Sequence, residues 1–106
     1  MITELSTANF DTEMLNSSKP VLVDFWSTWC GNCKMISPVI DKIAKEMEAT
    51  VKVCKMQVMS HTDPLVVRYK VSTLPTLLFI KDGEVKDTIV GFASKDNIVG
   101  RLNALL

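Results

Sequence analysis

The segment that most constrains the fold runs from Val21 to Trp26 and reads VLVDFW. A strand with one face in water alternates polar and apolar residues, whereas this run is apolar at every position except Asp24. A nearly continuous apolar run of this length is typical of a strand covered on both faces, as in the middle of a parallel sheet. The segment therefore predicts an α/β fold with helices packed on both sides of the sheet.

Patterns in the rest of the chain alternate between strand and helix. Strands are expected over 2–6, 51–58, 76–81 and 85–90, and helices over 9–16, 33–49, 64–70 and from residue 94 onward. The dipeptide Asp82-Gly83 predicts a hairpin turn between the last two strands. This order indicates a mixed sheet with helices on both faces. No linker or repeat divides the chain, so one domain over residues 1–106 is expected.

Local signals mark the ends and faces of the predicted helices. Apolar spacing in the first helix places Phe10, Met14 and Leu15 on one inward face. Residues with side chains suited to capping a helix N-terminus precede three of the helices. These candidate caps are Asn9, Asp63 and Ser94.

The charge balance excludes several classes of function. Lys and Arg together number 12, as do Asp and Glu, so the formal net charge is zero. A nucleic-acid-binding surface would be basic, and so would an electrostatic membrane anchor. The N-terminal residues do not have a secretory pattern, and no apolar run approaches the roughly 20 residues of a membrane span. We therefore expect a cytoplasmic protein that binds neither nucleic acid nor membrane.

Two of the three cysteines, Cys30 and Cys33, directly follow the buried strand and open the long predicted helix. Sites in such sheets favour the carboxyl ends of strands. At a helix N-terminus, free N–H groups and the macrodipole stabilise a thiolate and lower the pKa of a thiol placed there. Gly31 is expected to let the turn close tightly, and Lys34 adds positive charge nearby.

This position predicts thiol–disulfide exchange. Cys30, at the exposed end of the motif, is expected to attack a disulfide and form a mixed disulfide with it. Cys33, one turn into the helix, is expected to be more buried and to attack Cys30, which releases the reduced target. An inert pair or half of a metal site are the alternatives.

Zinc is the specific form of the metal alternative, since Cys30, Cys33, Cys54 and His61 amount to four possible ligands. Cys54, however, lies within an apolar strand and is expected to be a small core residue. His61 is expected in a surface loop, without a partner at metal-ligand spacing. No metal site is therefore predicted.

Asp24 is the anomaly of the central strand. Burial should raise its pKa toward the range that suits proton transfer, so Asp24 is a candidate base that takes the proton of Cys33 through water. The alternative is a carboxylate satisfied by a local hydrogen bond. Lys55, on a neighbouring predicted strand, either lies close enough to modulate Asp24 or is a solvated lysine.

Two further features concern the surroundings of the cysteines. A proline at the start of a strand, such as Pro75, is usually preceded by a trans peptide bond. Trp26 is expected in the core, whereas Trp29, beside Cys30, could lie exposed over the site.

Several separated segments together closely resemble the thioredoxin family. They are VLVDFWSTWCGNCKMISPVIDKIAKE, TLPTLLFIKDGEV and the later VGF, in register over nearly the whole chain. The resemblance implies the thioredoxin fold, with a central five-stranded mixed sheet and four flanking helices. It also implies that the bond before Pro75 is cis, the reverse of the expectation from proline alone, and that Pro75 faces the cysteines.

The resemblance further implies a shallow apolar groove in which a client backbone lies antiparallel to residue 74. The residues that border it are Trp29, Leu74, Pro75, Gly91 and Phe92. By this similarity the chain is a monomeric protein-disulfide reductase with a redox-active Cys30–Cys33 disulfide and no bound cofactor. Its electrons would come from a thioredoxin reductase, a flavoprotein that depends on NADPH or ferredoxin.

The chain departs from the family pattern at two positions. Asn32 replaces the proline of the usual Cys-Gly-Pro-Cys motif, which restores an N–H and frees φ. A disulfide that is easier to reduce is expected, and this gives weight to a thiol oxidase or disulfide isomerase as an alternative; a non-catalytic binding module is another. Met59 stands where relatives often carry an aspartate.

Overall fold

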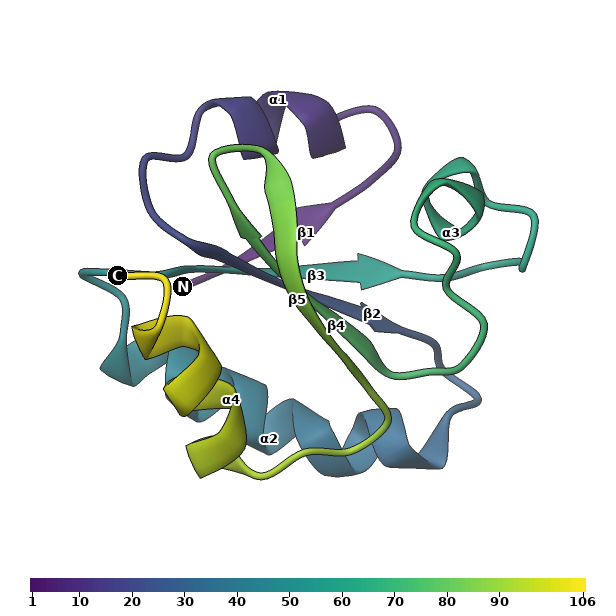
Figure 1. The fold of residues 1–106 in the computed structure, drawn as a ribbon. Coiled ribbons are helices and arrows are strands. Elements are labelled where there is room, and N and C mark those ends of the chain that lie inside the picture. Colours follow the sequence, from purple (N-terminus) through teal and green to yellow (C-terminus); the bar gives the residue numbers. More distant parts are fainter.

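A twisted sheet separates two layers of helices in the computed structural model, which describes residues 1–106 (Figure 1). The strands are β1 (Ile2–Leu5), β2 (Val21–Trp26), β3 (Lys52–Gln57), β4 (Thr76–Lys81) and β5 (Glu84–Val90). The helices are α1 (Phe10–Leu15), α2 (Gly31–Glu46), α3 (Pro64–Arg68) and α4 (Lys95–Asn103). The five strands lie in the order β1-β3-β2-β4-β5. β1, β3 and β2 are parallel, whereas β4 and β5 are antiparallel, which confirms the predicted mixed sheet and fold class.

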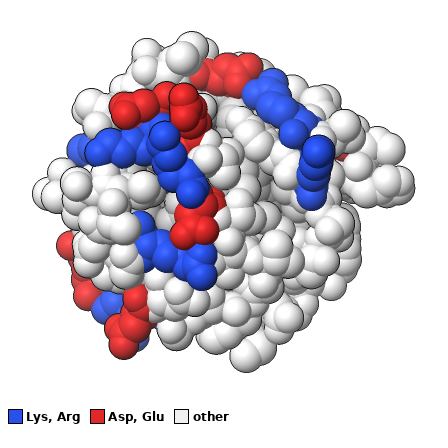
Figure 2. Space-filling view, in the orientation of Figure 1, with Lys and Arg blue, Asp and Glu red and all other residues white.

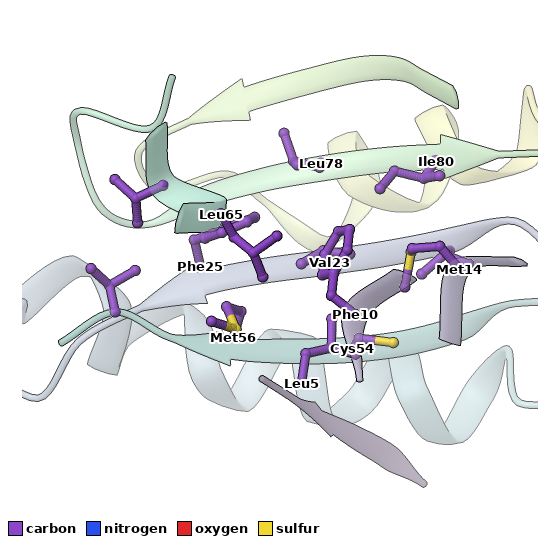
Figure 3. Close-up of a cluster of buried hydrophobic side chains, with 13 residues drawn as sticks. Leu5, Phe10, Met14, Val23, Phe25, Cys54, Met56, Leu65, Leu78 and Ile80 are labelled. Carbon is purple, nitrogen blue, oxygen red and sulfur yellow. The ribbon is translucent and has the colours of Figure 1, made fainter. Parts of the chain in front are cut away.

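The apolar run at β2 occupies the middle of this sheet, as predicted. Side chains that alternate along β2 enter two separate cores, because successive residues of a strand point to opposite faces. Val23 and Phe25 pack with residues of α1 and α3, and Figure 3 shows this cluster. Leu22 packs with residues of α2 and α4 on the other face.

The same alternation sets the direction of Asp24. It shares the face of Leu22, which is the face covered by α2. In the parallel pairing of β2 with β3, Asp24 lies in register with Lys55. The sheet therefore brings this carboxylate and this ammonium to the same side, beneath the first turns of α2.

Helix boundaries and faces differ in detail from the sequence expectations. α2 spans Gly31–Glu46 rather than 33–49, so both cysteines lie at or next to its first turn. In α1, Phe10 and Met14 are buried as predicted, but the prediction for Leu15 is wrong, since its side chain is exposed. The helix is only six residues long and ends at Leu15, so this side chain lies at its exposed end.

Only one of the three candidate caps bonds as predicted. Ser94 Oγ accepts a hydrogen bond from the N–H of Asn97 at 3.2 Å. Asp63 occupies the cap position of α3, but its Oδ2 accepts instead from the N–H of Met59 at 2.9 Å. Asn9 Oδ1 likewise accepts from the N–H of Ser6 at 2.7 Å, so both side chains brace the preceding loop.

Gly91, which follows β5, has a backbone conformation that favours glycine and can be tested by substitution. Its φ is +89°, in the left-handed region, and its N–H donates to the Pro75 carbonyl at 2.8 Å. Gly91→Ala should lower the free energy of unfolding by roughly 1–2 kcal/mol, because a Cβ disfavours this φ. Gly100→Ala is the matched control, since Gly100 lies within α4 in open space and alanine there should add roughly 0.5–1 kcal/mol. Urea unfolding at pH 7 gives the free energy of unfolding of both variants. Equal changes in the two variants would contradict the left-handed backbone conformation at Gly91.

Candidate active site

The two cysteines begin α2 directly after the loop that leaves β2. Cys30 is the N-cap residue of α2, with extended backbone angles, and is joined to Cys33 by a disulfide. The N–H of Cys33 donates to the Sγ of Cys30 at 3.1 Å. One of the unpaired N–H groups of the helix start is therefore directed at this sulfur, which is the arrangement that stabilises a thiolate.

The two sulfurs differ in their access to solvent as predicted. Cys30 is partly exposed, whereas Cys33 is only 4% exposed. The Sγ of Cys30 also lies 3.3 Å from the carbonyl oxygen of Leu74. The residue-74 segment therefore reaches the exposed sulfur from the opposite side of the site.

The loop before β4 lies against the cysteines. The Leu74–Pro75 peptide bond is cis, as the resemblance implied and contrary to the expectation from proline alone. Pro75 itself is buried, and its carbonyl accepts a hydrogen bond from the N–H of Gly91, which ties the end of β5 to the loop before β4. Phe92 follows Gly91 and is exposed.

Trp29 and Leu74 border an outer hollow of about 400 Å³. Trp29 is 67% exposed, as predicted for a residue beside Cys30. Met59 also lines this hollow and is exposed. Met59 therefore adds apolar surface to the hollow that Trp29 borders.

A second space, the inner cleft, lies beneath the cysteines and has a volume of about 410 Å³. It collects four of the residues predicted from sequence, Asp24, Cys33, Lys34 and Lys55. Its other lining residues are Trp26, Ser27, Thr28 and Ser37. Trp26 is only partly buried, so the prediction of a core residue holds in part: its ring lines the cleft, with a buried Nε1 that has no hydrogen-bond partner.

The hydroxyl residues of the inner cleft were not singled out from the sequence. Ser37 lies four residues after Cys33, and this helical spacing places both on one face of α2. Ser27 directly follows the buried strand and is itself buried, with an unpartnered Oγ. Helical periodicity was thus a usable signal for Ser37, whereas nothing comparable marked Ser27.

Asp24 is 1% exposed, and its Oδ1 has no hydrogen-bond partner. The alternative of a locally satisfied carboxylate therefore does not hold for this oxygen. Burial raises the pKa of Asp24 to about 6, while the nearby charge of Lys55 lowers it and that of Asp41 raises it. A carboxylate with this pKa is largely ionised at neutral pH and is well matched to accept a proton there.

Lys55 is not a solvated lysine. Its side chain is 15% exposed, and its Nζ donates to Ser37 Oγ at 3.0 Å. Its Nζ also lies 3.7 Å from Asp41 Oδ1. Lys55 therefore lines the inner cleft with Asp24, where its positive charge lowers the pKa of that carboxyl.

The residues between the cysteines are exposed. Gly31 does not have a left-handed φ, and a Cβ there would meet nothing within 4 Å. The expectation that glycine lets this turn close tightly is thus wrong, because the first turn of a helix accepts any residue with ordinary φ. Asn32 and Lys34 are exposed on the same turn.

The third cysteine lies on the other side of the sheet. Cys54 belongs to the core covered by α1 and α3, as predicted (Figure 3). Burial raises the pKa of its thiol to about 11. His61 is exposed, as predicted, and no three His, Cys, Asp or Glu side chains come together to hold a metal. The four candidate zinc ligands are therefore not brought together.

A cysteine pair that closes a disulfide at a helix start, beside a cis-proline loop, is the site of a thiol–disulfide oxidoreductase. The thioredoxin family model matches residues 1–104. A thioredoxin of Pseudomonas aeruginosa is 41% identical over 103 residues, which cover 97% of this chain and 94% of that protein. A thioredoxin of Rickettsia felis is 40% identical over 103 residues, 97% of each chain. One of Pyropia yezoensis is 39% identical over 102 residues, 96% of this chain and 94% of that protein.

The chain therefore belongs to the thioredoxin family. It is a disulfide oxidoreductase whose Cys30–Cys33 pair supports dithiol–disulfide exchange. None of its helices combines the length and the apolar character needed to cross a membrane.

The raised pKa of Asp24 predicts how stability depends on pH. The unfolded chain ionises Asp24 near 3.8 and the folded chain near 6, so the folded state holds this proton more tightly. Stability contributed by the protonated form is complete below pH 3.8 and falls as pH rises through 6. Asp24→Asn should therefore be more stable than the parent at pH 8 by about 2–3 kcal/mol, with little difference at pH 3.5. Urea unfolding of both oxidised proteins across this pH range measures the difference in their free energies of unfolding. A difference that does not change with pH would contradict the raised pKa of Asp24.

Proposed function

We propose that the chain, as a single domain over residues 1–106, reduces disulfides in other proteins, with Cys30 as the nucleophile and Cys33 as the resolving thiol. The observation that carries this assignment is the hydrogen bond from the N–H of Cys33 to Cys30 Sγ. It stabilises negative charge on the more exposed of the two sulfurs. The buried position of Cys33 suits a group that acts only inside the mixed disulfide.

The reaction proceeds in two exchanges. The thiolate of Cys30 attacks one sulfur of a client disulfide, so that a Cys30–client bond forms and the other client sulfur leaves as a thiolate. Cys33 then loses its proton and attacks Cys30 Sγ, which breaks the Cys30–client bond and releases the second client thiolate. Both client sulfurs take up protons. The client gains two electrons, and Cys30–Cys33 becomes the disulfide.

Asp24 is proposed as the base for the second exchange. It lines the same inner cleft as Cys33, and its pKa near 6 leaves it able to accept a proton at neutral pH. Water in the cleft would carry the proton, since the cleft is large enough to hold it. Lys55 favours the ionised carboxylate.

Clients are proposed to bind over the surface formed by Trp29, Leu74, Pro75, Gly91 and Phe92. Support comes from the exposed rings of Trp29 and Phe92 and from the approach of the Leu74 carbonyl to Cys30. On the face drawn in Figure 2, charged side chains of both signs gather at the left and top, whereas the lower right, over the start of α2, is uncharged. A surface of this kind suits many unrelated clients because it imposes little charge selection.

The electron source is proposed to be a thioredoxin reductase, a flavoprotein that uses NADPH or ferredoxin. The chain itself needs no bound cofactor, because the cysteine pair carries both electrons. We propose that the protein works as a monomer in the cytoplasm, where the reducing environment keeps such a pair available as dithiol. Neither nucleic acid nor membrane is proposed as a partner.

A second candidate, disulfide oxidation or isomerisation, is favoured by Asn32. Proline in this turn would fix φ and remove an N–H, both of which asparagine restores on an exposed turn. A pair that is easier to reduce donates electrons less readily and would serve oxidation or isomerisation better.

Reduction of insulin disulfides tests the proposed reductase. The parent should reduce insulin with dithiothreitol and also with NADPH and a thioredoxin reductase. Cys30→Ser should fall to the uncatalysed background because the attacking sulfur is lost. Cys33→Ser should instead accumulate one mixed disulfide per chain, detectable by mass spectrometry. If the parent fails with both electron sources the reductase is excluded, and retained partner binding in Cys30→Ser would then favour a non-catalytic module.

The role of Asn32 is tested by Asn32→Pro. Equilibrium titration against glutathione should give a more negative reduction potential for the variant than for the parent, by about 30 mV or more, equivalent to about 1.4 kcal/mol. Asn32→Ala serves as the control, since it removes the side chain but keeps the N–H and the free φ. A reduction potential of the parent that equals that of Asn32→Pro, or is more negative, would contradict the proposal that Asn32 makes the disulfide easier to reduce.

A further inference from the structure

The ammonium group of Lys55 lies between two partners on α2. It donates to Ser37 Oγ at 3.0 Å and lies 3.7 Å from Asp41 Oδ1. Cys33, Ser37 and Asp41 follow one another at four-residue spacing, so they form one row along the face of α2 that covers Lys55. The two partners of Lys55 are thus one helical turn apart, with Ser37 on the side of Cys33.

These partners pull the ammonium in different directions. Ser37 is half-buried and lines the inner cleft together with Asp24 and Cys33. Asp41 is 57% exposed and does not line the cleft. Lys55 has a flexible four-carbon stem, so its charge can shift between these positions at small cost.

We propose that Ser37 is a positioning residue, whose hydroxyl holds the Lys55 ammonium inside the cleft, beside Asp24, against the attraction of Asp41 at the rim. The proposal deepens the proposed function and rests on it for its consequence, since Asp24 is the base proposed there. Ser37 touches neither client nor sulfur in this role. It acts through Lys55.

The charged and titratable groups around Asp24 define what Ser37 can change. Lys55 comes from β3, and Cys33, Lys34 and Asp41 come from α2. On the other side, β4 places the apolar Leu77 opposite Asp24. Lys55 is thus the cation that favours the ionised carboxylate, and Asp41 is the anion that opposes it.

Removal of the Ser37 hydroxyl is therefore expected to raise the pKa of Asp24. Without it, the hydrogen bond that holds the ammonium in the cleft is lost, and Asp41 remains as its only close partner. The charge then recedes from Asp24, which becomes harder to ionise. Removal of the Asp41 charge should act in the opposite direction, because it withdraws both the competitor for Lys55 and a repelling charge.

The decisive measurement is the titration of the Asp24 carboxyl carbon by NMR, in the oxidised protein. Ser37→Ala should raise the pKa of Asp24 by about 0.5, the effect of moving a nearby charge away by about 2 Å at an effective dielectric constant of about 20. Asp41→Asn should lower it, and Ser37→Thr, which keeps a hydroxyl, should restore the parent value. Alanine suits a helix, so the variant should fold, and far-ultraviolet circular dichroism checks this. An unchanged or lowered pKa in Ser37→Ala overturns the proposal.

Kinetics separate this proposal from the proposed function. Rapid mixing with a client disulfide gives the rate of the second exchange as a function of pH. In Ser37→Ala the midpoint of this profile should move to higher pH by the same amount as the titration, with the plateau at high pH retained. An unmoved midpoint despite a shifted Asp24 titration would refute Asp24 as the base while supporting Ser37 as the positioning residue.

Discussion

The burial of β2 on both faces is the constraint on which the rest of the structure depends. A strand covered on both sides needs helices above and below it, and the parallel pairing with β3 requires α2 as the crossover between them. α2 must therefore start where β2 ends, at the carboxyl edge of the sheet. The free N–H groups of a helix and the end of a buried strand thus meet at one point, and the cysteines occupy it.

The same burial creates the chemistry beneath the cysteines. Any side chain on the α2 face of β2 is removed from water, so the carboxylate at position 24 is destabilised as an anion. In most of the sheet this face is filled by aliphatic residues, such as Leu22 and Val53. Near the start of α2 the aliphatic packing gives way to Asp24, Lys55 and hydroxyl side chains, which line a cleft instead. A local loss of apolar packing at the sheet edge therefore produces a reactive site.

The elements dominated by periodicity could be predicted from sequence. The run at β2, the Asp82-Gly83 turn and the cysteine pair at the start of α2 all follow from local patterns. The isomer before Pro75 did not follow from the residue itself, because the tertiary setting fixes it, and only the family resemblance indicated it. Leu15 was misplaced because its direction depends on where α1 ends, which a hydrophobic pattern alone locates poorly.

The polar residues of the cleft were harder to foresee for a related reason. A serine at position 27 or 37 is unremarkable in a sequence, since serine is common in loops and on helix surfaces. Its role depends on which strand lies opposite and on what that strand carries, here Lys55. This contact arises from the packing of α2 over β3, and it becomes visible only when the helix is placed on the sheet.

The three cysteines show how strongly position decides the behaviour of one side chain. Cys54 is enclosed by apolar residues, and burial raises the pKa of its thiol to about 11, which keeps it protonated and unreactive at neutral pH. Cys30 lies at a helix start with an N–H directed at its sulfur. The sheet lies between them, since Cys54 faces α1 and α3 while Cys33 faces α2. The fold thereby leaves Cys33 as the one other cysteine within reach of Cys30.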